Sequence, residues 1–355
     1  MTTQAFHWLT VTEVAQLTDE AVAISLDVPN DARDSFRYLP GQHMVLRAII
    51  DGEDVRRSYS ICSNAKEGKL RIGVKRLEGG AFSTFATTRL AAGDMIEAMP
   101  PIGEFVIEPD RALARHRCAI VAGSGITPVL SLVSTTLESE PESRWSVIYG
   151  NSRAGSVMFL DEIEGLKDRY GSRLHLIHVL SREETVPLLT GRIDRERLEG
   201  IFSALVDFSS VDEWYLCGPY EMVMTSRAFV EGHGVAPDVV HDELFFAGPP
   251  PDPSVRPRSA DTGSVELVFT LDGRDSAVRL DPDQALLDAA LVMRPELPYS
   301  CRGGMCASCK ALLIEGEVEM DKNYALVAED LNRGFTLTCQ AHPRSDRVVV
   351  DFDQR

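Results

Sequence analysis

The chain has 355 residues, of which 44% are hydrophobic and 25% charged, and its formal net charge is −18. This length and composition predict a globular protein of two or three domains with ample core. The negative charge argues against nucleic acid or an anionic membrane as a partner; it suits docking to a basic protein surface, or no more than a solvated acidic surface. Because no apolar stretch approaches the roughly 20 residues of a membrane span and no signal-like segment begins the chain, we expect a cytoplasmic protein.

Residues 1–112 are expected to form an antiparallel β-barrel domain. Short apolar runs recur between Gly, Pro, Asn and Asp residues, at 21–26, 43–46 and 70–74. Such spacing is typical of short antiparallel strands joined by turns. Residues 100–103 resemble the closing strand of a known family of such barrels, which leads out of the barrel.

Two patterns in this domain indicate a flavin site. In Arg57-Ser58-Tyr59-Ser60, a guanidinium can fork onto phosphate, a ring can stack on a flavin and a hydroxyl can bond to its reactive nitrogen. From Gly80 to Ser83, a glycine-led helix start suits a pyrophosphate, and Ser83 can cap the helix or contact phosphate. The alternatives are an ordinary strand with an exposed arginine and a turn with a helix cap. In this order, the two patterns resemble the R-x-Y-S and G-x-x-S motifs of the ferredoxin–NADP reductase superfamily.

Residues 113–246 alternate between apolar strands and amphipathic helices. Strands are expected at 116–121, 145–149, 174–180 and 214–217, and a helix with Phe159, Ile163 and Leu166 on one face follows the second strand. This alternation predicts an α/β domain with a parallel sheet.

Two further motifs follow strands of this domain. Gly123, Gly125, Thr127 and Pro128 form a G-x-G-x-T-P loop that differs from the six-residue Rossmann fingerprint, yet its glycines allow close approach of a phosphate to a helix N-terminus. About 90 residues later stands Cys217-Gly218-Pro219, whose cysteine could equally be a buried thiol at a strand end. The pair resembles the nicotinamide-nucleotide motifs of the same superfamily.

Two predictions in this domain depend on single residues. Ser181 and Arg182, after the third strand, resemble a segment that grips the 2′-phosphate of NADPH, so NADPH is expected in preference to NADH; the alternative is a turn with surface charges. Phe245 stands in an E-x-F segment that in relatives packs near the flavin, and it is a candidate shield over the ring; the alternative is a core aromatic.

The C-terminal part follows a proline-rich linker at 247–263 and covers residues 264–355. A hairpin around Asp272-Gly273 is expected to precede a helix that starts at Asp281-Pro282. Together with the cysteine motif below, these elements predict an α+β, ferredoxin-like (β-grasp) domain.

Four cysteines near the C-terminus are the most specific signal of the sequence. Cys301, Cys306 and Cys309 have the spacing C-x4-C-x2-C, and Cys339 follows after 29 residues. This is the plant-type [2Fe-2S] ferredoxin spacing, although zinc is an alternative for a cysteine cluster. The other three cysteines, Cys62, Cys118 and Cys217, are expected to be thiols, which indicates a reducing compartment.

The order flavin domain, nucleotide domain and [2Fe-2S] domain resembles the reductase components of bacterial multicomponent oxygenases. The segment from Asn323 to Asp346 is most similar to the reductase subunit of phenylacetyl-CoA epoxidase, followed by that of 3-ketosteroid 9α-hydroxylase. The resemblance implies FAD, with FMN as the alternative, and transfer of electrons from NAD(P)H through flavin and cluster to a non-haem iron oxygenase. Arg57, Tyr59, Ser60, Gly80 and Ser83 are implied at the flavin, with Tyr59, Ser60 and Cys217 at the reacting atoms. The alternatives are the reductase of another Rieske-type oxygenase and a general diaphorase.

Overall fold

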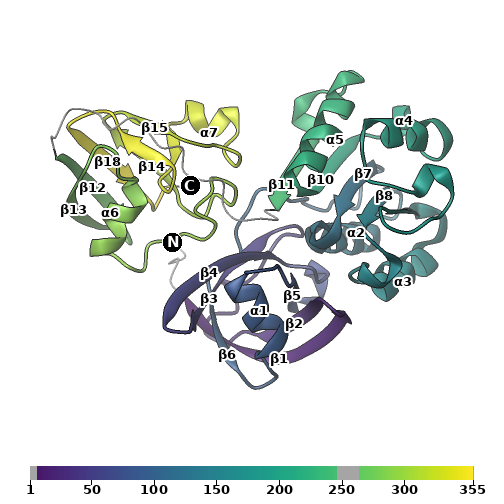
Figure 1. The fold of residues 1–355 in the computed structure, drawn as a ribbon, viewed down its shortest axis with the longest axis horizontal. Coiled ribbons are helices and arrows are strands. Elements are labelled where there is room, and N and C mark those ends of the chain that lie inside the picture. Colours follow the sequence, from purple (N-terminus) through teal and green to yellow (C-terminus); the bar gives the residue numbers. More distant parts are fainter. Residues whose placement is uncertain (1–5, 246–263, 355) are drawn as a thin grey trace. The chain divides into compact units, whose positions relative to one another are not determined.

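The computed structural model of the chain describes residues 6–245 and 264–354, and the expected linker at 247–263 lies outside them. The N-terminal strands form one antiparallel sheet in the order β4-β3-β6-β1-β2-β5 (Figure 1). A bridge between Ile61 and Ile72 joins the two end strands, so the sheet closes on itself and the predicted barrel is confirmed. Helix α1 packs on it. The elements are β1 His7–Thr18, β2 Ala21–Asp27, β3 His43–Ile50, β4 Glu53–Ser60, β5 Leu70–Lys75, α1 Ala81–Thr88 and β6 Met95–Ala98.

The expected closing strand at residues 100–103 is wrong. Only Ile102 pairs there, through one bridge to His43, and the last full strand of the barrel along the chain is β6, which lies between β3 and β1. Pro100 and Pro101 explain the difference, because proline has no N–H group to donate to a ladder.

The next domain has a parallel sheet in the order β11-β10-β7-β8-β9, which confirms the expected α/β architecture. Helices α2 and α3 lie on one side of this sheet and α4 and α5 on the other (Figure 1). Phe159 directly precedes α3 instead of forming its first turn. The elements are β7 His116–Ala122, α2 Ile126–Ser139, β8 Arg144–Asn151, α3 Leu160–Tyr170, β9 Leu174–Leu180, α4 Arg195–Ala204, β10 Glu213–Pro219, α5 Tyr220–Gly232 and β11 Val240–Phe245.

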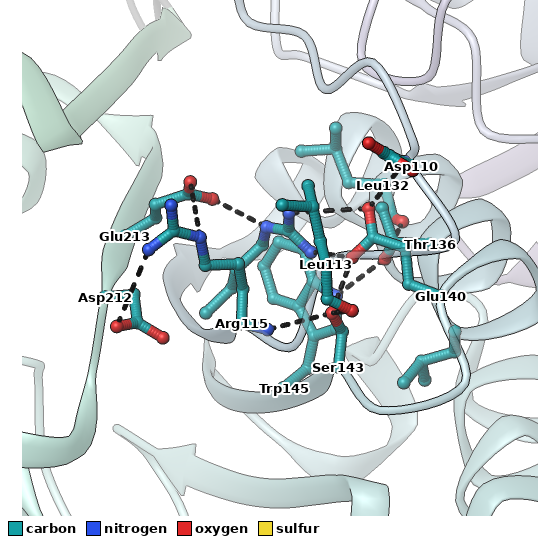
Figure 2. Close-up of polar contacts among 12 residues, drawn as sticks. Asp110, Leu113, Arg115, Leu132, Thr136, Glu140, Ser143, Trp145, Asp212 and Glu213 are labelled. Atoms are coloured by element: carbon teal, nitrogen blue, oxygen red, sulfur yellow. Dashed lines mark hydrogen bonds and ion pairs between the residues drawn. The ribbon is translucent and has the colours of Figure 1, made fainter.

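A buried ion network ties the end of α2 to the amino ends of these strands. Arg117 Nη1 lies 2.6 Å from a carboxylate oxygen of Glu140, and its Nε lies 2.6 Å from Glu213. The hydroxyl of Ser143 donates to Glu140, and the indole of Trp145 donates to Thr136 (Figure 2). The Glu140 side chain is fully buried, so these partners are what make an ionised carboxylate tolerable there.

The C-terminal domain has a mixed sheet in the order β13-β12-β18-β14-β16, in which β12 and β18 are parallel and the other pairs antiparallel. Asp272 and Gly273 both have positive φ, as a two-residue hairpin turn requires. The elements are β12 Val265–Leu271, β13 Arg274–Leu280, α6 Leu286–Met293, β14 Lys310–Glu315, β15 Val318–Met320, α7 Ala328–Asn332, β16 Phe335–Leu337, β17 Ala341–Pro343 and β18 Arg347–Asp351.

The expected helix start at Asp281 is also wrong, because α6 begins at Leu286. The N–H of Gln284 bonds to the carbonyl of Asp281, so the segment first forms a turn. His342 then bonds to the carbonyl of Asp283 and holds that turn in place. No helix in the described ranges combines the length and apolar character needed to cross a membrane.

Candidate flavin, nucleotide and iron–sulfur sites

Strand β4 carries the aromatic and cationic groups predicted to bind flavin. Arg57 and Tyr59 are two residues apart and therefore project from the same face of the strand. Behind Tyr59 lies Phe82 of α1, with ring centroids 5.3 Å apart. The side chain of Arg57 is exposed, and its guanidinium donates to the carbonyl of Arg56. A supported ring beside an exposed guanidinium fits an isoalloxazine with its phosphate.

The start of α1 is built by a different contact from the one expected. Gly80 is the N-cap residue, and the hydroxyl of Ser83 makes no capping bond; it accepts from the N–H of Leu77 and donates to the carbonyl of Gly80. The capping role proposed for Ser83 is therefore wrong. A Cβ at position 80 would lie 2.5 Å from that hydroxyl oxygen, so glycine is needed for the approach. Backbone N–H groups in the first turn have no partner within the helix and fit a pyrophosphate.

Ser60 is bonded to a carboxylate at the end of the nucleotide domain. Its hydroxyl, in a side chain that is buried, donates to Glu243 over 3.0 Å, and the imidazole Nδ1 of His43 lies 3.4 Å from the other oxygen of Glu243. Glu243 pairs in register with Cys217 of β10. One carboxylate thus joins the R-x-Y-S strand to the C-G-P strand. Sequence reasoning missed Glu243 and His43.

The two nucleotide motifs meet at the carboxyl ends of β7 and β10. A Cβ at Gly125 would lie 2.3 Å from the carbonyl oxygen of Cys217, and one at Gly218 would lie 3.2 Å from backbone atoms of Ala122. Gly218 also has a φ of +146°, which few other residues adopt. Gly125 and Gly218 are therefore required by the contact of one loop with the other.

Cys217 and Thr127 are both buried at this junction. Burial raises the pKa of the Cys217 thiol well above its ordinary value, and the neighbouring Glu243 carboxylate adds to the effect. The thiol is thus protonated near neutral pH and is no thiolate nucleophile. Thr127 bonds through its hydroxyl to the carbonyl of Ser124 and so closes the loop; Pro128 lies within the first turn of α2, as expected.

Two arginines lie side by side after β8 and β9. The N–H of Arg182 bonds to the carbonyl of Ser152, and that of Ser181 to the carbonyl of Asn151, so the loop carrying Arg153 runs next to the loop carrying Arg182. Both arginine side chains are exposed, and neither forms an ion pair within residues 6–245 and 264–354. Phe245, at the end of β11, packs against the core of this part of the chain.

The cluster loop is shaped so that backbone N–H groups reach sulfur. Arg302, Gly304 and Ala307 have positive φ, which turns the chain tightly. The N–H groups of Gly303 and Met305 lie 3.4 and 3.5 Å from the Cys301 sulfur. Such bonds stabilise thiolate ligands and tune a cluster. A Cβ at Gly304 would lie 2.9 Å from the carbonyl oxygen of Lys322, which explains the glycine.

The four cysteines are arranged in two pairs. The side chains of Cys301 and Cys306 contact each other, as do those of Cys309 and Cys339. Two thiolates for each of two irons is the ligand set of a plant-type cluster. Within the described residues, no three or more His, Cys, Asp or Glu side chains converge on one point as around a single ion. All seven cysteines are free of disulfides, and Cys62, Cys118 and Cys217 are buried thiols.

A separate groove of about 1350 Å³ lies between the barrel and helices α2 and α3. Tyr38, Arg71 and Glu162 are among its lining residues, and none of the predicted site residues is. Nη1 of Arg71 lies 2.8 Å from a carboxylate oxygen of Glu162, so an ion pair joins the barrel to helix α3 across the groove. The predicted residues Tyr59, Ser60 and Cys217 lie outside this groove.

A flavin site, a nucleotide site and a cluster loop in one chain define an NAD(P)H-dependent electron-transfer flavoprotein. Family models agree: residues 8–107 match the oxidoreductase FAD-binding domain, residues 119–228 the oxidoreductase NAD-binding domain, and residues 269–344 the 2Fe-2S iron–sulfur cluster binding domain. The cofactors are FAD, NAD(P)H and a [2Fe-2S] cluster, and zinc is set aside.

The chain is 40% identical to a subunit of the 1,2-phenylacetyl-CoA epoxidase of Escherichia coli (strain K12) over 352 residues, covering 99% of this chain and 98% of that protein. It is 31% identical to the ferredoxin reductase component of 3-ketosteroid-9-alpha-monooxygenase of Rhodococcus rhodochrous over 353 residues, 97% and 96% of the two chains. Phthalate dioxygenase reductase has the same fold, with 21% identity, 98% coverage of both chains and a TM-score of 0.58. The chain belongs to the family of oxygenase reductase components that pass electrons from NAD(P)H through FAD to a [2Fe-2S] cluster.

Proposed function

We propose that this reductase supplies electrons to the non-haem iron oxygenase of a phenylacetyl-CoA epoxidase-type system. The observation that carries the proposal is the 40% identity to a subunit of that enzyme, which extends over nearly the full length of both chains. The 31% identity to the reductase of a 3-ketosteroid monooxygenase supports a second candidate acceptor, the oxygenase of such a system.

We assign Arg57, Tyr59, Ser60, Gly80 and Ser83 to FAD. When bound, FAD takes a hydride from the nicotinamide and passes single electrons to the cluster. Tyr59 would support the ring, Arg57 would bind a phosphate, and the first turn of α1 would face the pyrophosphate. Ser60, held by Glu243, would present its hydroxyl near the reacting nitrogen.

We assign Gly123, Gly125, Thr127, Pro128, Cys217 and Gly218 to the nicotinamide nucleotide, with Phe245 beside the flavin ring. The close contact of Gly125 with Cys217 supports one shared site for the two motifs. Because the Cys217 thiol is protonated and fully buried, its role is to fill space beside the nicotinamide, and no covalent step is required. Cys301, Cys306, Cys309 and Cys339 would hold the cluster.

We propose NADPH as the donor. Ser181 and Arg182 are the residues proposed for the 2′-phosphate, with Arg153 as a further possible contact. The bond from the N–H of Arg182 to the carbonyl of Ser152 supports this choice, because it brings the two loops together. Exposed arginines on two adjacent loops, in a chain of net charge −18, favour the extra dianion of the 2′-phosphate. We also propose a cytoplasmic location. The proposed domain boundaries are 112/113, 246/247 and 263/264, and the first of them falls between β6 and β7.

The acceptor is tested by reconstitution. The purified chain is mixed with the oxygenase component of the Escherichia coli phenylacetyl-CoA epoxidase, phenylacetyl-CoA and NADPH, and epoxide formation is measured. The Cys306→Ser variant is the matched control, because it should oxidise NADPH without forming product. No product with this oxygenase, but product with a 3-ketosteroid monooxygenase component, would establish the second candidate.

A further inference from the structure

Tyr149 is a fully buried residue of β8 that reaches the nucleotide loop. Its hydroxyl donates to the carbonyl of Gly123 over 3.1 Å and to the carbonyl of Met158 over 3.2 Å. Burial raises the pKa of this phenol above its ordinary value, so the proton that makes these bonds is retained. In the sequence, Tyr149 is the last residue of the strand expected at 145–149.

Gly123 is the residue at which the loop turns. It has a φ of +56°, and a Cβ there would meet only the ammonium of Lys75 at 3.9 Å. Conformation, not space, therefore requires glycine at this position. The carbonyl oxygen of Gly123 accepts the N–H of Ile126 within the turn and the hydroxyl of Tyr149 from β8, so the Tyr149 bond is the one that ties the turn to the neighbouring strand.

The loop is anchored from two sides. Gly125 is pressed against the backbone of Cys217 on β10, whereas Gly123 is held by Tyr149 on β8. β8 and β10 flank β7 on its two sides. The Tyr149 hydroxyl therefore holds the loop on the β8 side, and the contact of Gly125 with the Cys217 backbone holds it on the β10 side.

The second acceptor of Tyr149 extends the connection to the flavin domain. Met158 precedes Phe159, which is buried with a φ of +57°. A Cβ at Gly73 of β5 would lie 2.8 Å from the Phe159 ring and 2.7 Å from the methyl group of Thr127. One hydroxyl therefore joins the nucleotide loop to the corner that packs on a flavin-domain strand.

We propose that Tyr149 is a positioning residue for the nicotinamide nucleotide: its hydroxyl fixes the Gly123 carbonyl and so orients the loop N–H groups that face the pyrophosphate. The inference rests on the proposed function, in which residues 123–128 bind the nucleotide. In this role Tyr149 acts on the nucleotide through its bond to Gly123, and its bond to Met158 anchors the same hydroxyl on the other side.

The test is Tyr149→Phe in the full chain with FAD and cluster bound. The oxidised protein is titrated with NADP⁺, and the dissociation constant is read from the flavin difference spectrum. Loss of one net hydrogen bond should weaken binding roughly three- to tenfold. Hydrogen exchange at the amides of Ser124 and Gly125 should accelerate, while flavin content and the cluster spectrum stay unchanged.

Tyr38→Phe is the matched control. The Tyr38 hydroxyl also donates to two backbone carbonyls, those of Ser63 at 3.2 Å and Lys69 at 2.9 Å, neither of which belongs to residues 123–128. This variant should leave NADP⁺ affinity and loop exchange as in the parent protein.

An affinity for NADP⁺ in Tyr149→Phe equal to that of Tyr38→Phe overturns the inference. If Tyr149→Phe loses flavin, hydrogen exchange at the amides of Ser124 and Gly125 decides the question. Exchange faster than in Tyr38→Phe would support the inference, and equal exchange would contradict it. A parent protein that shows no response to NADP⁺ would instead overturn the nucleotide assignment itself.

Discussion

The hydroxyl of Ser60 donates a hydrogen bond of 3.0 Å to the carboxylate of Glu243, although the two residues are 183 positions apart. Ser60 belongs to the strand proposed to hold the flavin and Glu243 to the strand beside Cys217. The bond fixes the hydroxyl between the strand proposed for the flavin and the strand that pairs with Cys217.

This contact predicts that Ser60 and Glu243 act as a unit. Ser60→Ala should slow flavin reduction by NADPH about tenfold or more, since a partly buried carboxylate loses a donor worth about 1.5–3 kcal/mol. Stopped-flow absorbance would measure the rate. Glu243→Ala combined with Ser60→Ala should cost little more than either alone.

The control for this pair is Ser25→Ala. Ser25 also bonds to a glutamate, Glu13, but at 3.4 Å and on an exposed part of the barrel. Its removal should leave flavin reduction unchanged, and strictly additive effects of the Ser60 and Glu243 substitutions would contradict their coupling.

Replacing one cluster ligand should separate the two halves of the electron path. Cys306→Ser removes one of the four thiolates, so cluster absorption and transfer to acceptors that draw on the cluster should be lost. NADPH oxidation with ferricyanide, which draws on the flavin, should persist. Cys118→Ser, at a buried cysteine outside the cluster loop, is the control; loss of flavin in Cys306→Ser would count against independent domains.

The exposed arginine after β9 should set nucleotide preference. Arg182→Ala removes a charge-assisted bond to the 2′-phosphate, so KM for NADPH should rise about tenfold or more while KM for NADH changes little. Steady-state kinetics with both donors measure the ratio. Arg195→Ala, at an arginine paired with Glu199 on the surface, is the control. Equal effects on the two donors would remove the 2′-phosphate role.

The buried network should matter more than any surface ion pair. Glu140→Ala leaves the Arg117 guanidinium with one carboxylate partner fewer, and breaking such a buried pair costs about 3–5 kcal/mol of stability. Urea denaturation followed by circular dichroism gives the free energy of unfolding. Glu199→Ala, which breaks an exposed pair, should cost less than about 0.5 kcal/mol. A cost below about 1 kcal/mol for Glu140→Ala would show that the cavity relaxes around Arg117.

Local pattern was sufficient to predict the three-domain fold, the parallel sheet and the cysteine loop, because each depends on short-range spacing. It failed where a distant residue decides a local structure. The turn before α6 is held by His342, 59 positions beyond its partner Asp283. The miss at Ser83 is different in kind, because the competing partner Leu77 is only six positions away.

The residues missed at the site share one property: their partners are remote in sequence. Glu243 is the glutamate of the E-x-F segment, but no local pattern indicates its bond to Ser60, which is 183 positions away. His43 reads as an ordinary strand residue, and no local signal marks it. The sequence around Tyr149 likewise does not indicate which group its hydroxyl bonds to, because a buried tyrosine can find its partner anywhere in the fold.

The central claim, that electrons pass from NADPH through FAD to the cluster, is tested most directly by an anaerobic titration. NADPH is added in steps to the purified protein while visible absorbance is recorded. We predict that the flavin and cluster bands both bleach, and that NADH bleaches them only at higher concentration. A protein whose flavin bands bleach while the cluster bands persist would contradict this account of electron transfer.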